Sequence, residues 1–347
     1  MDYRLNRWEG YKEYHRLMLE VGDCDPAYPA MRYLADRFEL NLEQRYWLAW
    51  LYSISYCVPT AYYMLSEFPD YENVDNRRLE KWWNSNKSRC LFQTDRAKVK
   101  NFDKIVPMFL SYRQMMGDSQ DRTYRKMLLE SPETSYNSVY ASLSDLYYFG
   151  RYSLFLLLES VHEIAGLYIR PTGLNLKEAE SCRNGLIYAC GKDNWIQKKK
   201  HNQPIPEEGY RFLDAKLKQL YDELTSENRD LEITYWNIET TLCAYKKLFW
   251  NTRYFGYYID RQMEEIITMQ NKVREGVDWS VLWDFRREYF GRSMLGEYGG
   301  WRGVRTKLFT LVTKTGRITN ALPEKHKNPK FQGSDKAYEL TDIALSI

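Results

Sequence analysis

The sequence has no long apolar run: no stretch approaches the roughly 20 uninterrupted apolar residues that a transmembrane helix needs. The N-terminal segment Met1–Glu9 is charged and has no apolar centre, so we expect no secretory signal peptide. Cysteine is also scarce, and the six cysteines form no CxxC pair. We therefore expect reduced, mostly buried thiols in a cytoplasmic protein that does not enter a membrane.

Only four histidines are present, which leaves little material for a histidine-built zinc site. Glu159 and His162 have the ExxH spacing of di-iron bundles, but the other histidines supply no second pair. Gly185 and Gly191–Asp193 differ from a phosphate-binding P-loop, because five residues rather than four separate the glycines and Asp replaces Ser or Thr. We expect no metal site and no obligatory cofactor.

The overall charge does not indicate a class of binding partner, because 50 Lys and Arg residues nearly balance 47 Asp and Glu residues. A hydrophobic share of 44% and a charged share of 28% are typical of a globular protein and exclude a wholly disordered one. The charge is nevertheless uneven: Trp301–Lys330 contains eight Lys or Arg residues and one acid. This asymmetry indicates a basic C-terminal extension that suits a polyanion.

Helix signals recur along most of the chain. Asn41–Gln44 reads as a capping box that begins a helix reaching about Glu67. Arg151–Leu158 follows a glycine and is apolar on nearly every side, which predicts a central buried helix. Asn175–Glu178 reads as a second capping box, leading a helix to about Gly191.

Strand signals are few, although Leu308–Thr313 is β-leaning and suggests either a hairpin or a partly ordered arm. We predict a mainly α, compact multi-helix protein. Its expected organisation is a helical catalytic domain over residues 1–297 and a basic extension over residues 298–347. A division of the helical domain into two lobes near residues 135–150 stays open.

One face of a helix predicted over residues 231–252 carries candidate site residues. At 3.6 residues per turn the following side chains lie within about 40° of one line: Glu239, Cys243, Lys246, Trp250 and Arg253. Glu239 and Lys246 are two turns apart, roughly 10 Å, which suits a ligand held between them. The alternative is a solvated face, against which the apolar neighbours argue.

A second candidate group follows a turn. Glu180, Arg183 and Asn184 share one helix face, and Asn175 stands where the chain enters that helix. A helix N-terminus presents free N–H groups to an anion, and Arg151 stands at another predicted helix start. Two such N-termini would suit a phosphorylated ligand, although Glu180 and Arg183 could equally form a surface ion pair.

The aromatic share is high at 16%, with 30 Tyr, 14 Phe and 11 Trp. Most of these rings should lie in the core. A minority are interleaved with cations, as a protein needs in order to stack bases and follow a phosphate backbone. The cations that we expect to contact DNA are Lys98, Lys100, Arg302, Arg305 and Lys307.

Several runs together resemble a known family. They are Tyr46–Tyr52 with Pro59–Ala61, Leu91–Arg96, Phe149–Ser153, Thr172–Asn175 and Glu180–Leu186. These runs are similar to those of the phage amino acid:DNA transferases, also described as α-glutamyl/putrescinyl thymine pyrophosphorylases, which hypermodify thymine. The relation of that family to helix-hairpin-helix DNA glycosylases implies a glycosylase-like fold, although the usual hairpin consensus is absent here.

The resemblance implies a substrate and a place of action. The substrate would be double-stranded phage DNA that carries 5-(pyrophosphoryloxymethyl)uracil, in the cytoplasm of the infected bacterial host. A free amino acid or polyamine would displace pyrophosphate, and no obligatory cofactor follows. Reaching the base calls for base flipping, the amine must lose a proton to a carboxylate, and cations must meet the leaving group and the carboxylate of the amino acid.

Role assignments follow from the spacing described above. As catalytic residues we predict Glu239, Lys246 and Glu180. As residues that bind substrate or pyrophosphate we predict Arg151, Arg183, Asn184, Asn175 and Arg253. Two alternatives stay open, a glycosylase or lyase that acts on a modified base and a non-catalytic DNA-binding protein. The transferred amine, the DNA context and the oligomeric state are also open, as are the identity of the general base and whether a metal assists the departure of pyrophosphate.

Overall fold

The computed structural model describes residues 2–92, 103–196, 204–289 and 311–318. Secondary structure in these ranges consists of helices and includes no strand, so the mainly α prediction is confirmed. None of the described helices is long and apolar enough to cross a membrane.

The described residues cluster into two compact units. The first contains residues 2–26, 171–196, 204–261, 289 and 311–318, and the second contains 27–92, 103–170 and 262–288. Two changes of unit therefore fall inside helices, between Arg261 and Gln262 and between Glu288 and Tyr289, and none falls near residues 135–150. The expected domain ranges 1–297 and 298–347 stay predictions.

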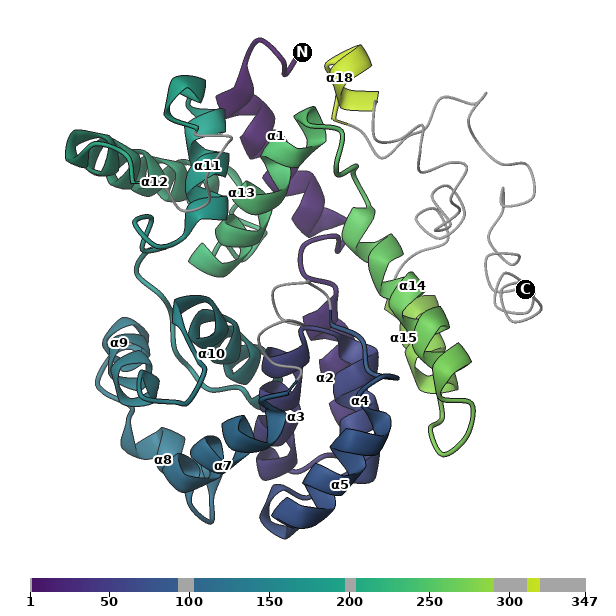
Figure 1. Cartoon of the computed structure of the whole chain (residues 1–347). Coiled ribbons are helices and arrows are strands. Elements are labelled where there is room, and N and C mark those ends of the chain that lie inside the picture. Colours follow the sequence, from purple (N-terminus) through teal and green to yellow (C-terminus); the bar gives the residue numbers. More distant parts are fainter. Residues whose placement is uncertain (1, 93–102, 197–203, 290–310, 319–347) are drawn as a thin grey trace, which may run out of the picture. The chain divides into compact units, whose positions relative to one another are not determined.

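The first unit is built around two packed helices, α11 and α13 (Figure 1). Its helices are α1 (Arg7–Glu20), α11 (Glu180–Ala189), the 3-10 helix η2 (Asp193–Trp195), α12 (Glu207–Glu227), α13 (Tyr235–Phe249), the start of α14 (Tyr257–Lys272) and α18 (Leu311–Thr315). Helix α1 contacts both α11 and α13, whereas α12 packs on α11 and α18 packs on α13.

A glycine permits the close crossing of α11 and α13. A Cβ atom added at Gly185 would lie 2.0 Å from the backbone oxygen of Leu242, so only glycine fits at this contact.

A buried acid caps the start of α14: the Asp23 carboxylate accepts hydrogen bonds from the N–H groups of Gly256, Tyr258 and Ile259 at 2.8, 3.0 and 3.0 Å. Burial raises the pKa of the Asp23 carboxyl to about 8, and these three donors act in the opposite direction.

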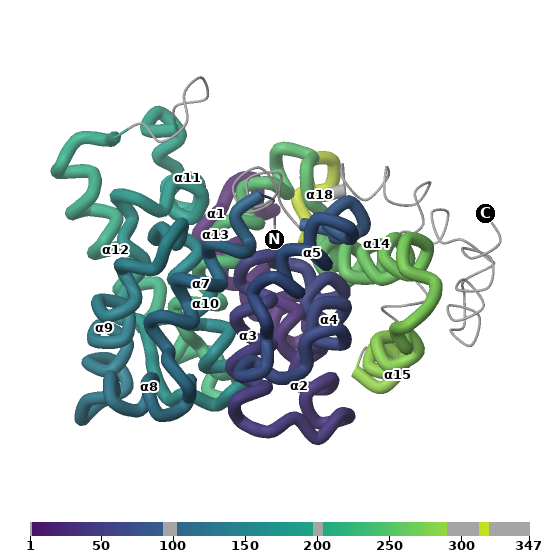
Figure 2. The backbone as a smooth tube through the Cα atoms, turned by 60° about the horizontal axis from the view of Figure 1, so that its bottom comes forward, coloured from purple at the N-terminus to yellow at the C-terminus, as the bar shows by residue number. Residues whose placement is uncertain are grey.

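The second unit is organised around α3 and α10, which Figure 2 shows side by side. Its helices are α2 (Ala27–Arg37), α3 (Leu42–Ser55), α4 (Val58–Glu67), the 3-10 helix η1 (Tyr71–Asn73), α5 (Asn76–Asn86), α7 (Ile105–Met116), α8 (Gln120–Lys126), α9 (Pro132–Leu143), α10 (Arg151–Ala165), the rest of α14 and α15 (Ser280–Tyr289). Helix α3 also contacts α4 and α8, and α10 also contacts α2 and α9.

The core of the second unit is strongly aromatic. Every residue from Leu154 to Val161 in α10 is buried, which confirms the predicted central helix. Trp47 and Trp50 of α3 stack with ring centroids 5.0 Å apart, and Tyr112 of α7 stacks on Trp50 at 5.3 Å. Such pairs add about 0.5–1.5 kcal/mol each beyond the area that they bury.

The capping box at Asn41 is confirmed, but the single long helix expected after it is wrong. The Asn41 side chain accepts from the Gln44 N–H, and the Gln44 side chain accepts from the Asn41 N–H, both at 3.0 Å. The helix ends at Ser55 because Tyr56 adopts a left-handed backbone with φ of 51°. A new helix begins at Val58, where Pro59 occupies a first-turn position that needs no N–H donor.

Two other expectations need correction. Asn175 does not begin a helix: its φ of 43° turns the chain, and α11 starts five residues later at Glu180. The hairpin alternative for Leu308–Thr313 is wrong for residues 311–313, which are helical, and residues 308–310 lie outside the described ranges. The end of α18 pairs with the N-terminal segment, because the Tyr3 N–H donates to the Gly316 carbonyl at 2.8 Å.

Candidate functional site

The strongest candidate site lies where α13 packs on α11, and its centre is Lys246. Only 3% of Lys246 is exposed. Its ammonium donates to the Ser181 carbonyl at 2.5 Å, to Ser181 Oγ at 3.0 Å and to the Cys243 carbonyl at 3.2 Å. These three acceptors are neutral oxygens, so the charge of a buried cation is solvated by the fold without direct contact with a carboxylate.

The surroundings of Lys246 concentrate positive charge at the C-terminal end of α13. Burial lowers the pKa of Lys246, and the thiols of Cys243 and Cys182 and the carboxylates of Glu239 and Glu180 act in the opposite direction. Burial also lowers the pKa of Lys247 to about 8, and repulsion from Arg253 contributes to that shift. Cations that are so close and so poorly hydrated would be stabilised by a bound anion.

Glu239 completes the buried part of the site. It is 8% exposed and lies on α13 two turns before Lys246, as the spacing predicted. Burial, and next the Glu239 carboxylate, raise the pKa of the Cys243 thiol to about 12. Cys243 is therefore a protonated thiol at neutral pH rather than a nucleophilic thiolate.

The buried ammonium lies directly beneath the protein surface. Ser181, its hydrogen-bond partner, is exposed, and Glu180 and Asn184 on α11 are half-buried. Trp250 is 41% exposed, and its ring centroid lies 5.9 Å from Lys246 Nζ. The site thus combines a cation, carboxylates and an accessible ring at the junction of two helices.

Arg183 is held by the fold on the other side of α11. It is 2% exposed, and its Nη1 donates to the carbonyls of Leu176 and Lys177 at 2.9 and 2.8 Å. Its guanidinium also lies 5.7 Å from the ring centroid of Tyr210 on α12. These contacts fasten the turn that Asn175 begins, and they explain the burial of Arg183 without a ligand.

Arg253 and Arg151 occupy different surroundings. The guanidinium carbon of Arg253 lies 3.9 Å from the ring centroid of Tyr257, just beyond the C-terminal end of α13. Arg151 is the first residue of α10 in the second unit, and its guanidinium carbon lies 5.1 Å from the ring centroid of Phe155. The five predicted DNA contacts, Lys98, Lys100, Arg302, Arg305 and Lys307, lie outside the described residues.

Comparison with protein families identifies the chain. The model of the family described as amino acid:DNA transferase matches residues 19–254, more than half of the sequence. The chain belongs to the amino acid:DNA transferase family. Comparison with curated proteins and with solved structures gave no match. The matched range includes the whole of α10, α11 and α13, so the helices that carry Arg151, Arg183 and Lys246 are part of the transferase region.

Two residues of this transferase site were missed by sequence reasoning. Lys247 lies next to Lys246 and is half-buried, and Ser181 provides two of the three acceptors for the Lys246 ammonium. Lys247 is four residues after Cys243, so the helical period of 3.6 residues could have placed it on the same face of α13. Nothing in the sequence pointed to Ser181, because its role depends on the crossing of two helices.

Metal ligation has no support in the described part of the transferase. No group of three or more His, Cys, Asp or Glu side chains within residues 2–92, 103–196, 204–289 and 311–318 is arranged to hold a metal ion. The six cysteines are free thiols, which confirms that they form no disulfide. Three of them, Cys57, Cys90 and Cys182, are buried, and the other three are half-buried.

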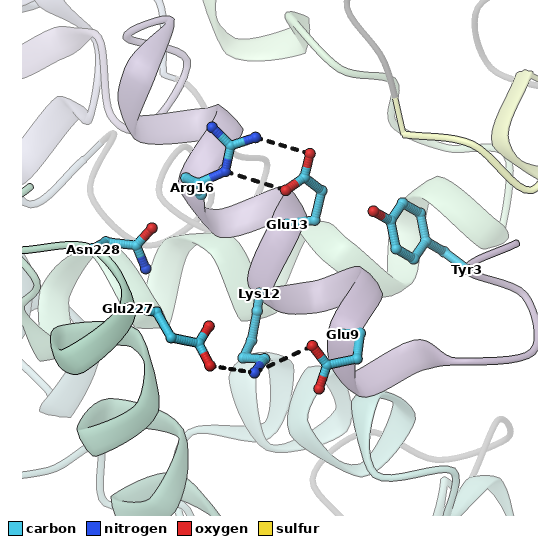
Figure 3. Close-up of a pocket in the computed structure, with 7 residues that line it drawn as sticks. All are labelled: Tyr3, Glu9, Lys12, Glu13, Arg16, Glu227 and Asn228. Carbon is cyan, nitrogen blue, oxygen red and sulfur yellow. Dashed lines mark hydrogen bonds and ion pairs between the residues drawn. The ribbon is translucent and has the colours of Figure 1, made fainter. Parts of the chain in front are cut away.

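A surface groove of about 280 Å³ lies elsewhere in the first unit, between α1 and the end of α12 (Figure 3). It is lined by Tyr3, Glu9, Lys12, Glu13, Arg16, Glu227 and Asn228. Lys12 Nζ lies 2.7 Å from Glu227 and 3.2 Å from Glu9, and Arg16 pairs with Glu13 at 2.9 Å. Because both cations of the groove are already paired with carboxylates and no predicted site residue lines it, we do not assign the transfer chemistry to it.

Proposed function

We propose that this transferase joins the amine of a free amino acid or polyamine to the methylene carbon of 5-(pyrophosphoryloxymethyl)uracil in double-stranded phage DNA. A C–N bond forms at that carbon while its C–O bond breaks, and the electron pair leaves with pyrophosphate. The amine loses one proton, which a carboxylate accepts. We place this reaction in the cytoplasm of the infected host cell.

Family membership supports the general reaction, an amino acid transferred to DNA. The observation that carries the finer proposal is the poorly hydrated positive charge at the end of α13, where burial and repulsion lower the pKa of Lys247 to about 8. A departing pyrophosphate gains negative charge as its bond breaks, so cations that are fixed before the reaction stabilise the transition state more than the substrate.

Within this proposal each residue has a defined role. The pyrophosphate, or the carboxylate of the amino acid, is bound by Lys246, Lys247 and Arg253. The proton of the amine is accepted by Glu239 or Glu180. Asn184 contributes a further contact to the anionic ligand. Arg151, at the N-terminus of α10 in the second unit, stays a predicted anion-binding residue. Arg183 and Asn175 act on the ligand through the turn that they hold ahead of α11.

Nucleoside mass spectrometry tests this proposal. DNA carrying the pyrophosphorylated base is incubated with the protein and a panel of amino acids and polyamines, and we expect a heavier nucleoside together with released pyrophosphate. Glu239→Gln and Lys246→Met should abolish the product while the fold, followed by circular dichroism, persists. The matched controls are Glu178→Gln and Lys218→Met, which change exposed side chains and should keep full activity.

Other products would contradict the proposal. An abasic site or a strand break without a heavier nucleoside would indicate a glycosylase or lyase. DNA binding without any product across the panel would indicate a non-catalytic DNA-binding protein. Full activity in both Glu239→Gln and Lys246→Met would remove these side chains from the mechanism.

A further inference from the structure

The loop between α9 and α10 exposes two neighbouring tyrosines. Leu146 and Phe149 are 3% and 6% exposed and anchor the loop in the second unit, whereas Tyr147 and Tyr148 between them are 42% and 45% exposed. A single exposed ring needs no explanation, because much of any protein surface is apolar. Two adjacent exposed rings, held between two buried residues, form an exposed aromatic patch of the kind that often marks an interaction site.

Two backbone hydrogen bonds and a left-handed residue define the shape of the loop. The Tyr147 N–H donates to Ser111 Oγ of α7 at 2.9 Å, and the Phe149 N–H donates to the Leu146 carbonyl at 3.0 Å. Tyr148 has a φ of 65°, in the left-handed region that costs a bulky residue about 1–2 kcal/mol. This strained backbone places a large ring in solvent, and backbone strain of this kind clusters at functional sites.

A lysine adjoins the ring pair. The centroids of Tyr147 and Tyr148 are 4.9 Å apart, and Lys104 Nζ lies 5.7 Å from the Tyr148 centroid. The loop continues through Gly150 into the N-terminus of α10, where no side chain caps the helix and Arg151 is the first residue. Aromatic rings beside positive groups are the combination that binds nucleic acid, by stacking on bases and by pairing with phosphates.

We propose that the Tyr147–Tyr148 loop is a DNA-contacting element of this transferase. The two rings stack on nucleobases, and Lys104 together with the N-terminus of α10 lies against the phosphate backbone. The proposal rests on DNA as the substrate of the family, and it is independent of the leaving group, of the amine and of the residues that we assign to the chemistry.

Equilibrium binding of a fluorescein-labelled DNA duplex with a short single-stranded gap, whose bases are free to stack on the rings, tests the proposal by anisotropy. Tyr147→Ala/Tyr148→Ala removes both rings and should weaken binding by roughly 5- to 150-fold for each ring that stacks on a base. Because the rings carry no charge, the slope of log affinity against log salt should not change. Tyr147→Phe/Tyr148→Phe keeps both rings and should bind within about two-fold of the wild type.

Two further variants separate stacking from other effects. Lys104→Ala should weaken binding and reduce the salt slope by about one, as the loss of one phosphate contact does. Tyr168→Ala is the matched control, because Tyr168 is 59% exposed in the same unit and has Arg170 5.5 Å from its ring, but it belongs to no exposed pair. We expect Tyr168→Ala to leave the affinity unchanged.

Several outcomes would overturn the proposal. They are an unchanged affinity of the double alanine variant, an equal loss for Tyr168→Ala, or a loss of affinity in the double phenylalanine variant as large as in the alanine variant. The binding assay contains neither amine nor pyrophosphorylated base. Its failure would therefore leave the proposed function standing, and failure of the transfer assay would leave this loop as a DNA contact.

Discussion

Gly185→Ala is the sharpest test of the α11–α13 crossing. The added Cβ would lie 2.0 Å from the Leu242 oxygen and 2.6 Å from its carbonyl carbon, whereas ordinary contacts begin at 3.4 Å. Both atoms belong to the backbone of a helix, so no side-chain rotation relieves the overlap. To bring the distance between this Cβ and the Leu242 oxygen from 2.0 Å to an ordinary contact of 3.4 Å, the helices would have to separate by about 1.4 Å.

Two opposing effects decide the magnitude. Alanine is a better helix former than glycine by about 1 kcal/mol, which favours the variant. Overpacking of a well-packed interface costs about 1–3 kcal/mol, and a rigid backbone contact belongs at the upper end. We therefore expect a net loss of about 2 kcal/mol, which corresponds to a fall in melting temperature of about 4–8 °C.

The same separation should disable the site. The hydrogen bonds from Lys246 to Ser181 cross this interface at 2.5 and 3.0 Å, and an added 1.4 Å would break both. Lys246 would then lose two of its three acceptors while still buried, so transfer should be lost even below the melting temperature.

Thermal unfolding by calorimetry, with transfer assayed at 20 °C, measures both effects. Gly173→Ala is the matched control, because a Cβ there meets nothing within 4 Å and the residue belongs to the same unit. If Gly185→Ala melted at or above the temperature of Gly173→Ala and kept its activity, the close crossing would not be required and the reasoning would be refuted.

Three further predictions concern charge and stability. Burial lowers the pKa of His15 to about 3, so the unfolded chain binds a proton on this side chain more tightly than the folded chain does. The free energy of unfolding should therefore fall as the pH drops from about 6.5 towards 3. In His15→Gln this pH dependence, measured by urea unfolding, should be shallower. Burial lowers the pKa of Lys247 to about 8, so stability should rise between pH 8 and 10.5, and Lys247→Met should lose that rise and be more stable than the wild type at pH 7. The Glu43 carboxylate accepts from the N–H groups of Gln120 and Asp121 at 2.8 and 3.1 Å, so Glu43→Ala should reduce the free energy of unfolding by about 1–3 kcal/mol; an unchanged denaturation midpoint would contradict this.

Local sequence determined those parts of the fold whose cause is local. The reciprocal hydrogen bonds of Asn41 and Gln44 involve residues three apart, and the burial of Leu154–Val161 follows from an apolar surface on every side of one helix. The resemblance to amino acid:DNA transferases was equally readable, because it depends on residue identities along the chain. The break at Tyr56 was not, since a left-handed tyrosine is unfavourable by itself and exists only because surrounding contacts impose it.

Local sequence determined only part of the candidate site. The helical period placed Glu239 and Lys246 on one face of α13, but it could not show that Lys246 is buried against Ser181, a partner 65 residues away. Nor could it show that Arg183 is bound to the carbonyls of its own turn or that Tyr147 and Tyr148 are exposed. Hydration, hydrogen-bond partners and pKa depend on which helix covers a side chain. Two helices meet where their surfaces fit, at Gly185 in this chain, so only the tertiary structure decided the chemistry of these groups.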